Sequence, residues 1–138
     1  MVNGIILKKL HVLDETLAEL RSLGPVTAEG LADDWLARRA VERDLQVLIE
    51  VVIDLCQRII SLAGLTPTES GADAVERCAQ LGAISDRPSY RRMIQFRNFI
   101  VHRYERVDVA ILADIVNKRL GDFDEFRQEV LSYAASLD

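Results

Sequence analysis

The side chains best suited to act on a phosphodiester lie within eight consecutive residues, from Arg97 to Tyr104, which include Asn98 and His102. The planar guanidinium of an arginine keeps its charge and can bind two phosphate oxygens at once. A histidine exchanges its proton near neutral pH, which suits an acid or a base acting on a reacting oxygen. Together, Arg97 and His102 could hold a phosphate and move a proton during its transfer.

Arg97 lies on a predicted helix that runs from about residue 86 to about residue 103. At about 100° per residue, Arg97 falls in the middle of an apolar face. That face is made up of Tyr90, Met93, Ile94, Ile100, Val101 and Tyr104. A buried guanidinium needs a partner, because it cannot lose its charge. Two interpretations stay open: a structural ion pair with Asp54 or Glu50, or a cleft, within one chain or between two, in which Arg97 holds a phosphate.

His102 lies near the predicted end of the same helix. Asn98 precedes it by four residues, so these two side chains share a face and can touch. Arg97 and His102 are about 140° apart on an ideal helix, so both can reach one phosphate only if the helix ends there or the site spans two chains. The helix dipole favours an imidazolium at this end, which suits a proton donor, although a histidine here is often a simple cap. His11 has no such setting, and we expect an ordinary surface residue.

Helical periodicity runs through the chain, and no stretch alternates like a β-strand. The first predicted helix, over residues 5–23, has apolar residues at spacings of four, three, four and three, namely Ile6, Leu10, Leu13, Leu17 and Leu20. The second, over residues 34–63, is apolar on most sides, which is typical of a central helix. A third is capped by Ser70 and ends near Leu81. The fourth carries Arg97. A fifth begins at Asp108 and continues past Gly121 with a bend or a break.

These elements predict an all-α fold, an antiparallel bundle of about five helices that forms one domain over residues 1–138. Hydrophobic residues make up 49% of the chain and charged residues 28%, enough for a compact core. Cys56 and Cys78 lie in apolar surroundings without a nearby cysteine partner, so we expect neither a disulfide framework nor a zinc site. The N-terminus lacks the features of a signal peptide, and charged residues interrupt the most apolar stretch. We therefore expect a soluble cytoplasmic protein without a membrane span.

The net charge of −5 argues against a surface that coats nucleic acid. The charge is unevenly distributed, however, because the segment from Ser85 to Arg106 has six arginines and two acids, a net charge of +4, which leaves −9 elsewhere. If RNA binds, it should bind at this segment. The candidate contacts form a basic patch, defined as Arg91, Arg92, Arg103 and Arg106.

The residues from Arg97 to Tyr104 match the signature of HEPN proteins, an arginine, four residues, a histidine, one residue and a tyrosine. In the form seen here, with asparagine after the arginine, the motif resembles that of the HepT toxins. Residues 38–56 are similar to the long second helix of that family, and residues 81–108 to its motif helix and the following loop. The similarity covers most of the chain.

This resemblance implies a two-fold homodimer in which both motifs face a shared cleft and cleave RNA without a metal or another cofactor. Arg97 would bind and stabilise the scissile phosphate, His102 would be the acid or base in transfer to the ribose 2′-oxygen, and Asn98 would orient His102. The resemblance also implies a toxin–antitoxin pair of the HEPN–MNT kind, type II/VII-like. An MntA-type nucleotidyltransferase antitoxin would attach AMP to Tyr104 and so silence the toxin.

Two other functions compete with a ribonuclease toxin. The first is a catalytically silent HEPN partner module that binds a nucleotidyltransferase and accepts AMP. The second is a purely structural oligomerisation bundle, whose interface would be the apolar seam of the first helix. The sequence carries no base-reading signature that would show which RNA is cut.

Overall fold

The computed structural model describes residues 3–102 and 108–137, with the backbone alone at Val101 and His102. Within these residues the chain forms seven α-helices and no β-strand. The helices are α1 (Gly4–Ser22), α2 (Ala28–Asp33), α3 (Trp35–Leu62), α4 (Gly71–Gln80), α5 (Pro88–His102), α6 (Val109–Lys118) and α7 (Gly121–Ser136). The predicted all-α class is confirmed.

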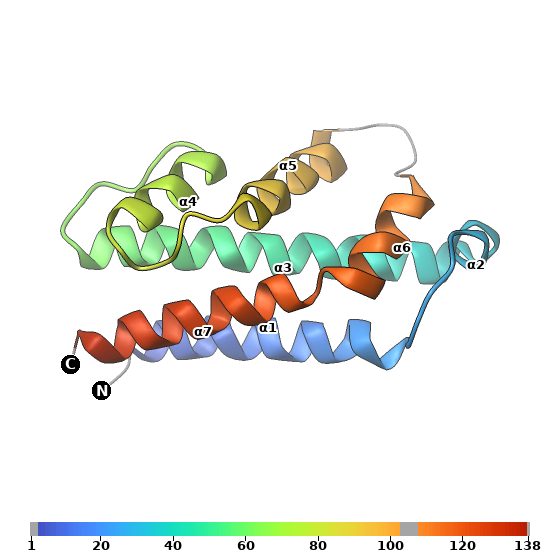
Figure 1. Cartoon of the computed structure of the whole chain (residues 1–138), viewed down its shortest axis with the longest axis horizontal. Helices are drawn as coiled ribbons and strands as arrows, with labels where there is room; N and C mark the ends of the chain where they lie inside the picture. Colours follow the sequence, from blue (N-terminus) through green and yellow to red (C-terminus); the bar gives the residue numbers. More distant parts are fainter. Residues whose placement is uncertain (1–2, 103–107, 138) are drawn as a thin grey trace.

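The long helix α3 lies at the centre of the bundle and contacts α1, α2, α4, α5 and α6. The helices α1, α3, α5 and α7 alternate in direction along the long axis of the molecule, so the bundle is antiparallel as predicted (Figure 1). Helix α5 packs on α3, next to α4, and also contacts α7. The helix that carries Arg97 is therefore held from three sides.

Side-chain caps start most of these helices. The side chains of Asn3, Thr27, Asp34, Ser70 and Asp108 each accept hydrogen bonds from free backbone amides in the first turn. The predicted cap at Ser70 is thus confirmed, as are the helix starts predicted near residue 34 and at Asp108. Gly64 and Gly82 follow α3 and α4 with φ angles of 81° and 78°, a left-handed conformation that glycine adopts without steric cost and that ends a helix.

The apolar seam of α1 is buried inside the protomer. All five of its predicted residues are at most 2% exposed, and α1 packs against α3 along its length. This burial confirms the helical spacing. It also contradicts the proposal that the seam is an interface between chains, because the protomer's own core already covers it.

The number of helices differs from the prediction of about five for two reasons. The connection after the first helix contains a six-residue helix, α2, which is too short for apolar periodicity to reveal. The predicted fifth helix is broken at Arg119 and Leu120 into α6 and α7. The break lets α6 pack against α2 while α7 packs against α5.

Cys56 of α3 and Cys78 of α4 are free and buried, and they lie against each other. The Cys78 thiol donates a hydrogen bond to the Cys56 carbonyl oxygen at 3.4 Å. Hydrogen bonding with Cys78, together with burial, raises the pKa of the Cys56 thiol well above its ordinary value. None of the helices in the described ranges combines the length and the apolar character that crossing a membrane requires.

Candidate functional site

The start of α5 is anchored by one carboxylate of α7. Glu129 accepts hydrogen bonds from the Ser85 backbone amide at 2.9 Å, from the Ser85 hydroxyl and from the Tyr90 hydroxyl. Its other contact is an ion pair with Arg87 at 3.4 Å. The Tyr90 ring is completely buried and packs edge-on against Phe126, with ring centroids 5.6 Å apart. This network fixes α5, and with it the motif, against α7.

The network also shifts the titration of its members. Burial raises the pKa of the Tyr90 phenol, and the bond to Glu129 raises it further. Burial alone would raise the pKa of Glu129, but the hydrogen bonds from Ser85 and Tyr90 outweigh burial and lower it. Glu129 is therefore ionised at neutral pH, and the anchor works as a charged acceptor.

Arg97 is partly buried on α5 and has no carboxylate partner among the described residues. Its Nε atom is buried without a hydrogen-bond partner, and its Nη1 atom donates to Asn98 Oδ1 at 3.3 Å. The two acids expected to neutralise it are occupied elsewhere. Asp54 pairs with Lys9 at 3.5 Å, and Glu50 accepts a hydrogen bond from Gln46 at 3.1 Å.

The predicted structural ion pair between Arg97 and Asp54 or Glu50 is therefore wrong. Arg97 remains a cation whose charge no described carboxylate balances, on a face that α5 otherwise uses for packing. The helical-wheel prediction of that face is confirmed at Tyr90, Met93 and Ile94, which are all buried. A half-buried, unpaired guanidinium is suited to receiving an anion.

The remaining motif residues follow Arg97 closely. Asn98 is exposed, and its Oδ1 accepts a hydrogen bond from the Arg97 guanidinium. The described part of α5 runs to His102, so the predicted helix end, one of the two conditions under which Arg97 and His102 could reach the same phosphate, stays a prediction. The side chain of His102 and the whole of Tyr104 lie outside the described residues. The predicted contact between Asn98 and His102 stays a prediction.

The basic patch divides between two sides of α5. Arg91 forms an ion pair with Asp86 and faces α4, whereas Arg92 faces α6 and has no ion pair with any described residue. Arg103 and Arg106 lie outside the described residues. Arg87, which also contributes to the positive charge of this segment, is balanced by Glu125 and Glu129. The described cations of α5 that no acid balances are thus Arg92 and Arg97.

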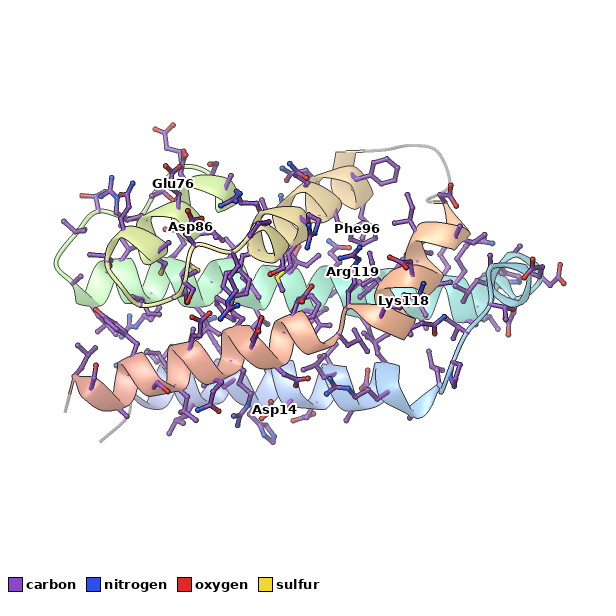
Figure 2. All side chains as sticks on the ribbon, viewed as in Figure 1. Asp14, Glu76, Asp86, Phe96, Lys118 and Arg119 are labelled. Carbon is purple, nitrogen blue, oxygen red and sulfur yellow. The ribbon has the colours of Figure 1, made fainter. Side chains whose placement is uncertain are left out.

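A hollow lies on each of two sides of α5, and the sequence predicted neither, because the shape of a hollow depends on how the helices pack. A cavity of about 330 Å³ lies between α5 and α6, with Phe96, Phe99 and Ile115 among its lining residues. Arg119 lines the same cavity, and Figure 2 labels Arg119 next to Phe96. The second hollow, a groove of about 540 Å³, lies between α4 and α5 and reaches Asn98.

No group of three histidine, cysteine, aspartate or glutamate side chains gathers in a way that could hold a metal ion, as far as the described residues go. The positively charged group that the structure describes at the site is the Arg97 guanidinium. What the described arrangement can do is bind an anion such as a phosphate on α5, with Asn98 beside it.

Comparison of the chain with known proteins identifies its relatives. A family model described as Ribonuclease HepT-like matches residues 13–130. The mRNA nuclease HepT of Shewanella oneidensis strain MR-1 is 26% identical over 129 residues, which cover 91% of this chain and 95% of the relative.

Solved structures share the fold. A tri-AMPylated Shewanella oneidensis HEPN toxin in complex with an MNT antitoxin has a TM-score of 0.83 at 23% identity, with 94% of this chain and 98% of that chain covered. A toxin–antitoxin structure with AMP-PNP has a TM-score of 0.81 at 23% identity and covers 93% of this chain and 98% of that chain. The resemblance inferred from the motif is thus confirmed. Because the family model spans most of its length, the chain belongs to the HepT-like ribonuclease family.

Proposed function

We propose that this chain is the ribonuclease toxin of a HEPN–MNT toxin–antitoxin pair, which cleaves cytoplasmic RNA without a metal and is silenced by AMP addition. The observation that carries the proposal is the state of Arg97, whose Nε is buried and unpartnered while Asp54 and Glu50 bond elsewhere. Membership of the family and the likeness to an mRNA nuclease from Shewanella oneidensis support it.

The chemistry follows from a cation and an imidazole close to one phosphate. The ribose 2′-oxygen attacks the phosphorus and loses its proton, the bond from phosphorus to the 5′-oxygen breaks, and the leaving 5′-oxygen takes up a proton. Arg97 stabilises the extra negative charge of the phosphorane, and His102 takes or gives one of the two protons. Asn98 holds Arg97 and orients His102. The products are a 2′,3′-cyclic phosphate and a free 5′-hydroxyl.

The active unit of the proposal is a homodimer with one cleft. Arg97 and His102 are about 140° apart on an ideal helix, so a second chain across a two-fold axis can supply the group that one chain cannot direct at the phosphate. Two copies of Arg97 in one cleft would also concentrate positive charge on a protein whose net charge is −5. Arg91, Arg92, Arg103 and Arg106 would extend this field along the RNA.

Silencing would act on Tyr104, which follows His102 by two positions in the sequence. In this step the phenol oxygen attacks the α-phosphorus of ATP, pyrophosphate leaves and the phenol proton is lost. A nucleotidyltransferase partner of the MntA type would catalyse the step. The attached AMP adds bulk and negative charge near Arg97, and so competes with RNA for the same cation. The AMPylated HEPN toxin in complex with an MNT antitoxin supports this regulation.

The test is RNA cleavage by the purified chain in the presence of EDTA. We expect cuts that leave 2′,3′-cyclic phosphates, and a loss of at least about 100-fold in Arg97→Ala and in His102→Ala. Arg97→Lys should also be impaired, because an ammonium lacks the bidentate fork. The control is Arg39→Ala, which removes an exposed arginine of α3.

Circular dichroism must show that each variant is folded. Cleavage by Arg97→Ala at the wild-type rate would contradict the proposal. If the wild-type chain accepts AMP on Tyr104 but cuts no RNA, the chain is instead the catalytically silent partner module.

A further inference from the structure

The groove between α4 and α5 is built like a small-ligand site. Its volume of about 540 Å³ lies within the range of roughly 300 to 1,000 Å³ that is usual for such sites. Val75 and Ala79 of α4 and Ile94 of α5 give it an apolar lining. Three carboxamides also line it, from Gln80 at the end of α4 and from Gln95 and Asn98 on α5.

One end of the groove is lined by Asn98, the neighbour of the arginine that we propose to bind phosphate. Gln95 and Asn98 are three residues apart on α5, so they lie on one face of the helix. Asn98 accepts a hydrogen bond from Arg97 at 3.3 Å. An RNA strand whose phosphate binds Arg97 therefore has the groove directly beside it on the α4 side.

The charged groups around the groove balance one another. Glu76 and Asp86 contribute two negative charges, and Arg87 and Arg91 contribute two positive charges. Figure 2 shows Glu76 and Asp86 on the α4 side of the molecule. Arg91 is paired with Asp86, and Arg87 with carboxylates of α7. A second phosphate finds no free cation here, so an uncharged part of the RNA fits better.

Gln80 and Gln95 are exposed, and their carboxamides have no hydrogen-bond partner among the described residues. A carboxamide presents a donor and an acceptor side by side, as the edge of a nucleobase does, and such pairs discriminate between bases. The apolar lining can cover the face of a base that is not stacked on its neighbours. Sequence-specific RNA recognition uses unpaired bases of this kind.

We infer that the groove between α4 and α5 binds the unpaired base of the nucleotide next to the cut phosphate, and that Gln80 and Gln95 read its edge. The inference rests on the proposed ribonuclease function. It makes these two glutamines specificity-determining residues, whereas Arg97 and His102 act on the phosphate.

Cleavage mapping on an RNA pool with randomised sequence tests this inference. The wild-type chain should prefer one base at a position next to the cut. Gln80→Leu and Gln95→Leu, which keep the side-chain size, should each reduce that preference on the order of tenfold, the loss expected for one amide–base pair. Ala72→Phe, at an exposed position that lines the groove, should do the same by blocking it. Gln128→Leu, an exposed position on α7, is the matched control.

A binding measurement separates this inference from the proposed function. The probe is an RNA oligonucleotide that carries 4-thiouridine, photo-crosslinked to the His102→Ala chain and mapped by mass spectrometry. We expect crosslinks within residues 72–80 in this chain, and their loss when Ala72→Phe is added.

The possible outcomes are distinct. Crosslinks in the groove without any RNA cleavage by the wild-type chain would support base binding in the groove and reject the ribonuclease function, and with it the assignment of that base to the nucleotide next to a cut. Crosslinks that map elsewhere would overturn the inference. So would a base preference that Gln80→Leu and Gln95→Leu both leave intact.

Discussion

Replacing Glu129 with glutamine tests how the motif helix is held in place. The two carboxylate oxygens of Glu129 serve different groups: Oε2 accepts from Ser85, and Oε1 accepts from Tyr90 and pairs with Arg87. Glutamine keeps the shape but turns one oxygen into an NH₂ group, which cannot accept a hydrogen bond. Either the Ser85 donors or the Tyr90 hydroxyl then lose their acceptor.

The size of the effect follows from the burial of these groups. Tyr90 is 0% exposed, and a buried donor left without an acceptor costs about 1–3 kcal/mol. The loss of charge also weakens the hydrogen bonds that remain. We therefore expect Glu129→Gln to lower the free energy of unfolding by about 2–3 kcal/mol at neutral pH.

The pH dependence of this effect has a definite sign. The pKa of Glu129 is lowered in the folded protein, so its ionised form is favoured there relative to the unfolded chain. The contribution to stability is complete above the unfolded pKa of about 4.3, and it is lost as the pH falls through the folded pKa. The difference between the wild type and Glu129→Gln should thus be largest near neutral pH and shrink below about pH 4.

The assay is urea unfolding followed by circular dichroism, at a series of pH values. Glu125→Gln is the matched control, because Glu125 is one helical turn away on α7 and forms an ion pair with Arg87 across the surface. We expect a much smaller change for this control. The reasoning is refuted if the two variants are equally stable at neutral pH, or if the loss in Glu129→Gln does not diminish on acidification.

Three further predictions concern the core and its ionisable groups. Burial and the neighbouring Glu19 raise the pKa of Asp44 to about 6, so ionised Asp44 destabilises the fold above that pH. Asp44→Asn should accordingly raise the urea midpoint at about pH 7.5 and leave it nearly unchanged at about pH 4. Leu13→Ala, in the seam of α1, should lower the free energy of unfolding by about 2–5 kcal/mol, which calorimetry or urea titration can check against Val12→Ala at an exposed position. Because both cysteines are buried and the pKa of Cys56 is raised, a thiol reagent should label the chain only in denaturant.

Local rules acting on neighbouring residues were sufficient to predict most of the secondary structure. The caps at Asp34, Ser70 and Asp108 depend on hydrogen bonds that span two or three residues, so the sequence reveals them directly. The apolar seam of the first helix was predicted for the same reason, because helical spacing depends only on residues three or four positions apart. The six-residue helix α2 was not predicted. The interruption near Gly121 was predicted, but the sequence left open whether it is a bend or a break, and packing against other helices decides this.

The sequence likewise predicted one part of the candidate site and not the other. From sequence alone, the periodicity of one helix places Arg97 on an apolar face and Asn98 beside it, because a helical repeat depends only on the order of residues. Whether a carboxylate neutralises that arginine depends on other helices. Asp54 and Glu50 were reasonable partners by type, yet they bond to Lys9 and Gln46 in the folded chain.

The sequence by itself therefore determined the all-α class, the main helices and a cation placed where an apolar residue is expected. Only the tertiary structure decided that this cation has no described carboxylate partner. It also decided that Glu129 of α7 anchors the helix of this cation and that a groove lies beside it between α4 and α5. The physical reason is the distance along the chain over which each interaction acts. Helical spacing and capping act over a few residues, whereas ion pairing, burial and the shape of a groove depend on chain segments that only folding brings together.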